Sequence, residues 1–167
     1  EWELKAKKAA KKGGALSVLL LPLAACGGGD SSSTSTTGST TGYVIDGYIR
    51  NVFLFRDEDG DGVFDAGEAS AYTNSAGQYT LGGSSTASIV VDPSQDPEGR
   101  VAVDLDNPNE AFTSVLKAPA GSTMVTPLTT IVQEIVATGE TLEAAQTAVK
   151  TALGITGDVD VTSLDPI

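Results

Sequence analysis

The chain of 167 residues has no histidine, one cysteine and one tryptophan. The absence of histidine disfavours zinc, which prefers nitrogen and sulfur ligands. The lone cysteine, Cys26, has no partner for a disulfide within the chain. Without histidine, no Ser-His or Cys-His pair is present to activate a nucleophile. We therefore expect no enzymatic activity.

Positive charge is scarce beyond residue 26. Twenty acidic residues follow that point, against five basic ones, namely Arg50, Arg56, Arg100, Lys117 and Lys150. A surface of this kind repels nucleic acid and anionic lipid. We therefore expect no nucleic-acid partner, and a medium that contains divalent cations suits the chain.

Aromatic side chains are also few. Trp2 lies in an N-terminal segment that we expect to be removed. The four tyrosines, Tyr43, Tyr48, Tyr72 and Tyr79, are better explained as strand residues than as platforms for sugars.

Residues 1–25 have the features of an export signal in the expected order. A basic patch of Lys5, Lys7, Lys8, Lys11 and Lys12 precedes the apolar run ALSVLLLPLAA, residues 15–25. This run is too short to span a bilayer of about 30 Å as a helix. Residues 23–26, LAAC, resemble the lipobox of bacterial lipoproteins. The resemblance implies that Cys26 is lipidated and becomes the mature N-terminus; the alternative is an ordinary signal peptide in which Cys26 is incidental.

The lipobox resemblance also implies a location. A lipid on Cys26 would attach the chain to a membrane at the cell surface. Gly27, rather than an aspartate, follows the cysteine. By resemblance to proteobacterial sorting, this favours the outer membrane in a host that has one.

Residues 27–42, GGGDSSSTSTTGSTTG, contain only glycine, serine, threonine and one aspartate, which predicts a flexible tether. We therefore divide the chain into a signal segment (1–25), the lipidated cysteine with its tether (26–42), a β module (43–118) and a helical segment (119–167). Since the sequence starts without methionine and ends at LDPI, we expect it to be a piece of a longer protein.

Residues 43–118 alternate short β-rich runs with turn residues. The candidate strands are residues 43–45, 48–49, 52–55, 71–73, 78–81, 88–91 and 100–105. Strands at this spacing predict a mainly β fold, a small antiparallel β-sandwich of about six or seven strands.

Beyond residue 121 the apolar period becomes that of helices. The first helix is expected to bury Leu128, Ile131, Val132 and Ile135, and the second to bury Leu142, Ala145, Val149 and Leu153. Thr126 and Thr141 are the predicted N-caps, Pro127 the first helical residue, and Gly139 and Gly154 the stops. The sequence therefore predicts a C-terminal αα-hairpin. Two short helices are only marginally stable alone, so we expect the hairpin to pack on another part of the protein.

The sequence DEDGDGVFDAGE, residues 57–68, holds six acidic residues and no basic one. With Asp57 as position 1, acidic residues occupy positions 1, 3, 5, 9 and 12, and Gly62 occupies position 6. The acidic residues in order are Asp57, Asp59, Asp61, Asp65 and Glu68. This spacing matches the EF-hand-like calcium loop D-x-[DN]-x-[DN]-G-x5-E at every required position.

The expected ligands follow from that pattern. The side chains of Asp57, Asp59 and Asp61, the carbonyl of Val63, Asp65 directly or through water, and a bidentate Glu68 would hold one Ca²⁺. Magnesium fits less well, since it demands a tight octahedron and keeps its water. The alternative is a solvated acidic loop without an ion.

The strand-like residues on both sides of the loop carry a second resemblance. Residues 52–56, 57–68 and 73–79, with Gly77 and Tyr79, resemble the calcium-binding B-type repeats of serine-aspartate surface adhesins and related prealbumin-like or carboxypeptidase-regulatory-like modules. The resemblance covers residues 44 to about 81, and the strands after residue 81 follow no repeat. It implies an Ig-like or prealbumin-like β-sandwich stiffened by calcium in a surface protein.

Two functions follow as expectations. The first is a non-catalytic, calcium-binding structural or adhesive module of a surface lipoprotein, with other surface proteins or glycans as partners. The alternative is an accessory ligand- or carbohydrate-binding module of a surface-anchored hydrolase whose catalytic domain lies outside this chain. A glycosidase-like carboxylate pair among Asp92, Asp96, Glu98, Asp104, Asp106 and Glu110 is less well supported than solvated loop acids.

Overall fold

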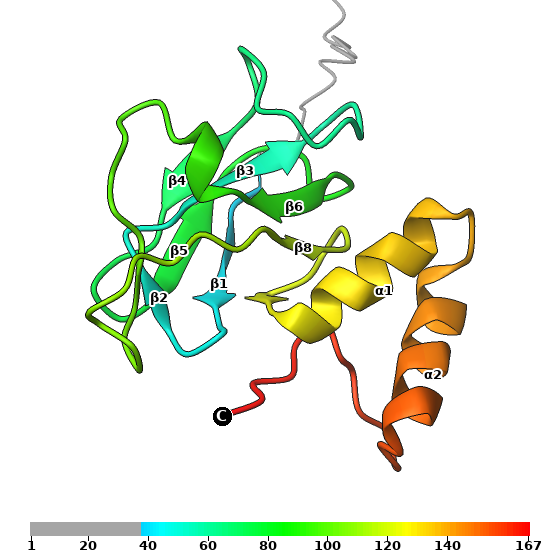
Figure 1. The fold of residues 1–167 in the computed structure, drawn as a ribbon. Coiled ribbons are helices and arrows are strands. Elements are labelled where there is room, and N and C mark those ends of the chain that lie inside the picture. Colours follow the sequence, from blue (N-terminus) through cyan, green and yellow to red (C-terminus); the bar gives the residue numbers. More distant parts are fainter. Residues whose placement is uncertain (1–37) are drawn as a thin grey trace, which may run out of the picture. The chain divides into compact units, whose positions relative to one another are not determined.

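The structure is a computed structural model that describes residues 38–167. The predictions for residues 1–37, the lipidation of Cys26 among them, lie outside the described residues. Figure 1 shows strands in one part of the described chain and two helices in the other. In chain order the elements are β1 (Thr40–Val44), β2 (Ile49–Arg50), β3 (Phe53–Asp57), β4 (Ser70–Tyr72), β5 (Gln78–Leu81), β6 (Ser88–Val91), the 3₁₀ turn η1 (Pro93–Gln95), β7 (Val103–Asp104), β8 (Leu116–Ala118), β9 (Met124–Val125), α1 (Pro127–Ala137) and α2 (Leu142–Leu153). No helix within this range is both long and apolar enough to cross a membrane.

Two sheets contribute to the main hydrophobic core. In the first, β3 lies between β4 and β6, and β8 pairs with β6; all three pairings are antiparallel. In the second, β1 lies between its antiparallel neighbour β5 and its parallel neighbour β9. β2 and β7 form a separate antiparallel pair. The prediction of a mainly β chain with antiparallel strands is confirmed, and the arrangement is compatible with a β-sandwich.

The core is built from alternating residues of both sheets. The first sheet contributes Leu54, Ile89, Val91, Leu116 and Ala118, and the second contributes Val44, Tyr79, Leu81 and Val125. Phe53 and Phe55 point to the other face of β3, where they cluster with Val90. Because both of its faces are covered, all five residues of β3 are buried.

Arg56 has the largest fully buried side chain of the described residues. Its guanidinium donates to the carbonyl oxygens of Gly82, at 3.4 Å, and Ala87, at 3.1 Å, and to the hydroxyl of Thr40, at 2.5 Å. Burial lowers the pKa of Arg56 below its ordinary value. These bonds join the end of β3 to the β5–β6 connection and to the first residue of β1.

Several strands differ from their predicted limits. β1 begins at Thr40, so its first three residues come from the sequence predicted as tether, and Gly42 is buried. The predicted strand at residues 100–105 shortens to Val103–Asp104. β8 and β9 were not predicted, and β9 lies within the segment predicted to be helical. Because β9 pairs with β1, residues from that segment are part of the second sheet.

The two helices begin and end where the sequence predicts. Thr126 and Thr141 are the N-caps, and the hydroxyl of each accepts the backbone N–H three residues further on. Pro127 is the first residue of α1, whose C-cap immediately precedes Gly139. Gly154 is the C-cap of α2. The predicted αα-hairpin is thus confirmed.

The buried face of the hairpin is narrower than predicted. Val132, Ala145 and Val149 are buried, and Leu128, Ile135 and Leu142 pack against them. The prediction that Ile131 and Leu153 are buried is wrong, because 48% and 54% of their surfaces are exposed. Leu153 is the last residue of α2.

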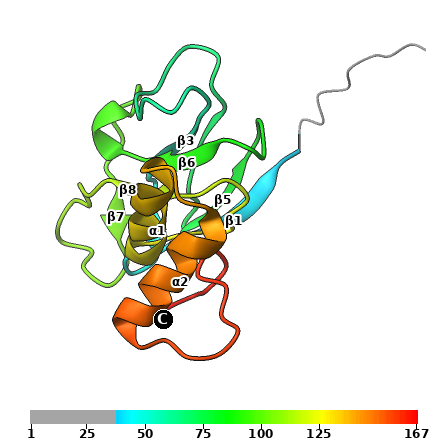
Figure 2. The same cartoon turned by 90° about the vertical axis from the view of Figure 1, so that its right-hand side faces the viewer.

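The exposure of Ile131 follows from the two partners of α1. Besides α2, the helix packs against β8 (Figures 1 and 2). The hydroxyl of Thr130 accepts the Lys117 N–H at 2.9 Å, and the hydroxyl of Thr129 donates to the Lys117 carbonyl at 2.8 Å. Threonines therefore complete the backbone bonds at the edge of β8, as a further strand would. Because α1 packs against both β8 and α2, the side of the helix that carries Ile131 has no partner among the described residues and is exposed to solvent.

Candidate metal centre

The acidic loop connects β3 to β4 in the first sheet. Asp57 is the last residue of β3, only 8% exposed, and lies opposite Ser88 of β6. On the other side, the Arg56 N–H donates to the Ala69 carbonyl at 2.8 Å. The loop is therefore held at both ends by a central strand of the sheet.

Carboxylates form the turns inside the loop. Asp57 Oδ1 accepts the N–H groups of Gly60, at 2.9 Å, and Gly62, at 3.2 Å. Asp61 Oδ1 accepts the Val63 N–H at 2.7 Å. Gly62 has φ of +76°, a conformation that glycine adopts without steric cost, which permits the sharp bend between these turns.

Three of the predicted ligands converge. One carboxylate oxygen from each of Asp57, Asp59 and Asp61 lies within 4.8 Å of the other two, and this group could hold a metal ion. Asp65 and Glu68 are not part of the group. Glu68 instead accepts the Glu58 N–H at 2.7 Å and the Asp65 N–H at 3.0 Å, which closes the loop.

The loop carboxylates have no basic partner within residues 38–167. The two ion pairs of that range are Arg100 with Glu98 and Lys117 with Glu134, both outside the loop. Arg56, the adjacent residue, directs its guanidinium to carbonyl and hydroxyl oxygens instead. Within the described part of the chain, no ion pair therefore balances the negative charge of the converging aspartates.

Phe64, at position 8 of the loop, packs on the outer face of the first sheet. Its ring centroid lies 5.0 Å from that of Phe53 and 5.5 Å from that of Phe55. Tyr72 of β4 also packs on Phe53, at 5.5 Å. The loop thus covers a second, smaller aromatic cluster, so its conformation affects the burial of β3.

A second segment, residues 92–100, lies against the loop. Gln95 of η1 accepts the Phe64 N–H at 2.7 Å and donates to the Gly62 carbonyl at 3.0 Å. Tyr72 donates a hydrogen bond to Asp96, and the Arg100 guanidinium lies 3.8 Å from the centre of the Tyr72 ring. Sequence reasoning missed Gln95, since a lone glutamine in a turn far along the chain carries no motif.

Three of the six carboxylates considered for a catalytic pair act as turn residues in the structure. Asp92 Oδ1 accepts the Ser94 N–H at 2.9 Å, and Asp104 Oδ1 accepts the Asp106 N–H at 2.8 Å. Asp96 likewise accepts the Glu98 N–H at 2.8 Å. These bonds give the three acids a structural role in their turns.

Asp92 and Asp96 have lowered pKa values. Burial alone would raise both, but hydrogen bonds outweigh it: from Gln95 and Ser94 to Asp92, and mainly from Tyr72 and backbone N–H groups to Asp96. Burial, followed by the bond to Asp96, raises the pKa of Tyr72 to about 12. The charged form of Asp96 therefore stabilises the fold.

We expect the contribution of Asp96 to depend on pH. A carboxyl with a lowered folded-state pKa stabilises the protein fully above its unfolded pKa, about 3.9, and loses this effect as pH falls through the folded value. The difference in unfolding free energy between the wild type and Asp96→Asn should be constant above about pH 5 and shrink below about pH 4. Urea unfolding in calcium-free buffer across this range measures it. A difference that stays constant to pH 2 would contradict the assignment.

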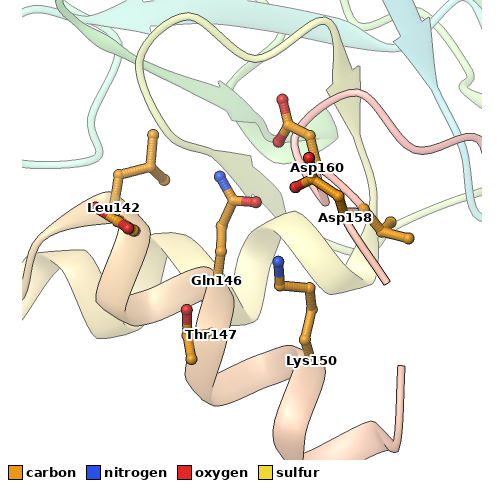
Figure 3. A pocket seen from close by; sticks show the side chains of 8 residues that line it. Leu142, Gln146, Thr147, Lys150, Asp158 and Asp160 are labelled. Carbon is orange, nitrogen blue, oxygen red and sulfur yellow. The ribbon is translucent and has the colours of Figure 1, made fainter. Parts of the chain in front are cut away.

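A separate hollow of about 580 Å³ lies between α2 and residues 158–160. Figure 3 shows Gln146 and Lys150 extending from α2 toward Asp158 and Asp160. The Gln146 side chain accepts the Val161 N–H at 3.1 Å, and Asp160 accepts the Thr162 N–H at 2.9 Å. The polar side chains that line this hollow therefore hold the backbone of the segment after α2.

No protein-family model matches this chain, and neither a curated protein nor a solved structure matches it significantly. The functional conclusion therefore depends on the loop and its surroundings.

Proposed function

We propose that this protein is a non-catalytic, calcium-binding structural module of a lipid-anchored cell-surface protein. The observation that carries the proposal is the convergence of Asp57, Asp59 and Asp61 within a twelve-residue calcium-loop pattern that has no basic partner among residues 38–167. Repulsion between such carboxylates costs on the order of 1 kcal/mol per pair even with water-like screening. A bound dication reverses the sign of this interaction.

The donor set fits a hard cation that takes six to eight oxygen ligands, as calcium does. Each carboxylate oxygen can accept more than one interaction, so the N–H bonds within the loop leave lone pairs for an ion. Asp57, Asp59 and Asp61 would bind through side chains and Val63 through its carbonyl. Asp65, directly or through water, and a bidentate Glu68 would complete the set. Zinc remains unsuited to a chain without histidine.

Calcium would act by fixing the loop on the sheet. The loop joins β3 to β4 and places Phe64 over Phe53 and Phe55. An ion that holds the loop therefore also protects the aromatic cluster and the central strand. This supports a stiffening role in a prealbumin-like β-sandwich, as part of a stalk or adhesin.

The cell-surface part of the proposal depends on the sequence of residues 5–26. The basic patch, the apolar run and LAAC stand in the order of a lipoprotein signal. Lipid on Cys26 would anchor the module, with the outer membrane as its location in a host that has one. Extracellular calcium modules typically bind at about 10⁻⁴–10⁻³ M, so the ion would be permanent outside the cell rather than a signal.

We expect calcium to raise the melting temperature of the purified protein. At a hundredfold excess over Kd, the gain is about 2.7 kcal/mol, or about 10 °C for a domain of this size. Differential scanning calorimetry in calcium, magnesium and excess chelator measures it, and Glu68→Ala serves as the control with a weakened site. Equal melting temperatures in calcium and chelator would show that the loop is only a solvated acidic loop.

A further inference from the structure

The side-chain amide of Gln95 bonds to the acidic loop on both sides of Val63. Its Nε2 donates to the Gly62 carbonyl at 3.0 Å, and its Oε1 accepts the Phe64 N–H at 2.7 Å. Val63 is position 7 of the loop, the position that supplies a backbone carbonyl to calcium. Val63 is 52% exposed and not part of the core, which suits a residue that contributes through its backbone.

The partners of Gln95 define the orientation of its amide group. Nε2 also donates to Asp92 Oδ2 at 2.8 Å. A carbonyl and a carboxylate only accept hydrogen bonds, and a backbone N–H only donates. The amide nitrogen must therefore face Gly62 and Asp92, and the amide oxygen must face Phe64.

Peptide geometry then defines the direction of the Val63 carbonyl. In a trans peptide, the C=O and N–H groups point in opposite directions. The Gly62 C=O points to Gln95, so the Val63 N–H points away, and it does so to Asp61 Oδ1 at 2.7 Å. The Phe64 N–H also points to Gln95, so the Val63 C=O points away as well. The Val63 carbonyl therefore lies on the same side as the carboxylate of Asp61.

We propose that Gln95 is a positioning residue of the metal centre, which holds the Val63 carbonyl toward the ion before the ion binds. The inference rests on the proposed calcium function. Gln95 does not touch the ion; it replaces the two backbone bonds that a neighbouring strand would make to this part of the loop.

The support for Gln95 is itself rigid. Gln95 is the last residue of η1, a turn capped by Asp92, whose Oδ1 accepts both the N–H and the hydroxyl of Ser94. The Asp92 side chain is buried. A buried carboxylate that caps the turn and holds the Gln95 amide leaves the amide little freedom to rotate. Residues outside the loop, Asp92 and Gln95, thus hold the loop backbone in the conformation proposed to bind calcium.

Gln95→Met tests the proposal, because methionine has a similar length and makes none of the three hydrogen bonds of the amide. Loss of an outer-shell partner typically weakens metal affinity about 10–100-fold. We expect Kd for calcium to rise by about this factor in isothermal titration calorimetry. The calcium-induced change in the Val63 carbonyl ¹³C chemical shift should also become smaller.

Gln146→Met is the matched control. Gln146 accepts the Val161 N–H at 3.1 Å, so the same substitution also removes a bond to the backbone, but on α2. It should lower stability equally with and without calcium and leave Kd unchanged. If Gln95→Met is unfolded without calcium, the calcium concentration that restores the fold reports the affinity instead.

The outcomes separate the two proposals. If the wild type shows no calcium binding, the proposed function fails, and the role of Gln95 fails with it. If the wild type binds calcium and Gln95→Met has the same Kd and the same Val63 shift, only the positioning role is overturned. A rise in Kd for Gln95→Met but not for Gln146→Met supports both.

Discussion

Replacement of Gly42 by alanine is expected to destabilise the described domain by more than about 4 kcal/mol, the range reserved for severe backbone or core damage. Gly42 is a buried residue of β1, between β5 and β9. An added Cβ would overlap the Thr123 carbonyl oxygen and lie 2.7 Å from the Thr123 carbonyl carbon and from the Tyr79 hydroxyl oxygen. Real Cβ atoms do not approach backbone atoms this closely, so one of the strands must move.

The neighbouring backbone is not free to move. The Thr123 carbonyl accepts the Tyr43 N–H at 3.0 Å, and the Thr123 and Met124 N–H groups both donate to the Thr162 carbonyl at 3.1 Å. A shift of Thr123 would break the parallel pairing of β1 with β9 and detach the segment after α2. A typical domain has only about 5–15 kcal/mol of stability, so this loss would remove a large part of it.

Gly82→Ala is the control for this prediction. An added Cβ at Gly82 would meet nothing within 4 Å. Since this open space accommodates the methyl group, the unfolding free energy should change by less than about 0.5 kcal/mol. Circular dichroism during urea unfolding compares the two variants. A Gly42→Ala protein as stable as Gly82→Ala would show that β1 and β9 do not pair as described.

Gly42 also shows where sequence reasoning failed for the fold. A run of glycine, serine and threonine offers no apolar period, so the sequence predicts a tether at residues 40–42. They form a strand because β5, distant in sequence, supplies their backbone partners, while β9 pairs with the next two residues, Tyr43 and Val44. Strands of two or three residues such as β8 and β9 depend in the same way on tertiary pairing, which leaves no local pattern.

The helices were predictable because their signals are local. Thr126, Pro127 and Gly139 mark the ends of α1 through hydrogen bonds and backbone preferences within one turn. Which side of α1 is buried depends on β8 and α2 together, and so the burial of Ile131 was mispredicted. Local chemistry determines where the helix begins and ends, and tertiary packing determines which of its faces is buried.

The candidate site shows the same division. Spacing alone indicated that Asp57, Asp59 and Asp61 converge, because turns within the loop bring alternate residues to one side. Gln95 reaches the loop only through the pairing of β6 with β3, which places the following turn η1 beside it. No feature of the sequence near residue 95 indicates that contact.

Asp57→Ala is expected to abolish calcium binding at millimolar concentrations. Asp57 is the buried member of the three converging aspartates, and its Oδ1 also accepts the N–H groups of Gly60 and Gly62. Alanine removes a ligand and the group that shapes the turn. The loss should therefore exceed the 10–100-fold typical of outer-shell partners, and Kd should rise from about 10⁻⁴–10⁻³ M to at least about 10⁻² M. Calorimetric titration and the calcium dependence of the melting temperature both measure this.

Asp57→Asn separates the charge of Asp57 from its role in the turn. Asparagine keeps an oxygen that can accept the two N–H groups, so the calcium-free protein should melt near the wild-type temperature, whereas Asp57→Ala should melt lower. Both variants should lose most of the calcium-induced rise in melting temperature, since each removes one negative charge from the site. Asp104→Asn is the control, because Asp104 also accepts a backbone N–H in a turn, at 2.8 Å, but lies outside the loop. If Asp104→Asn reduced calcium binding as much as Asp57→Asn, the effect would reflect net charge, and the loop would not be the site.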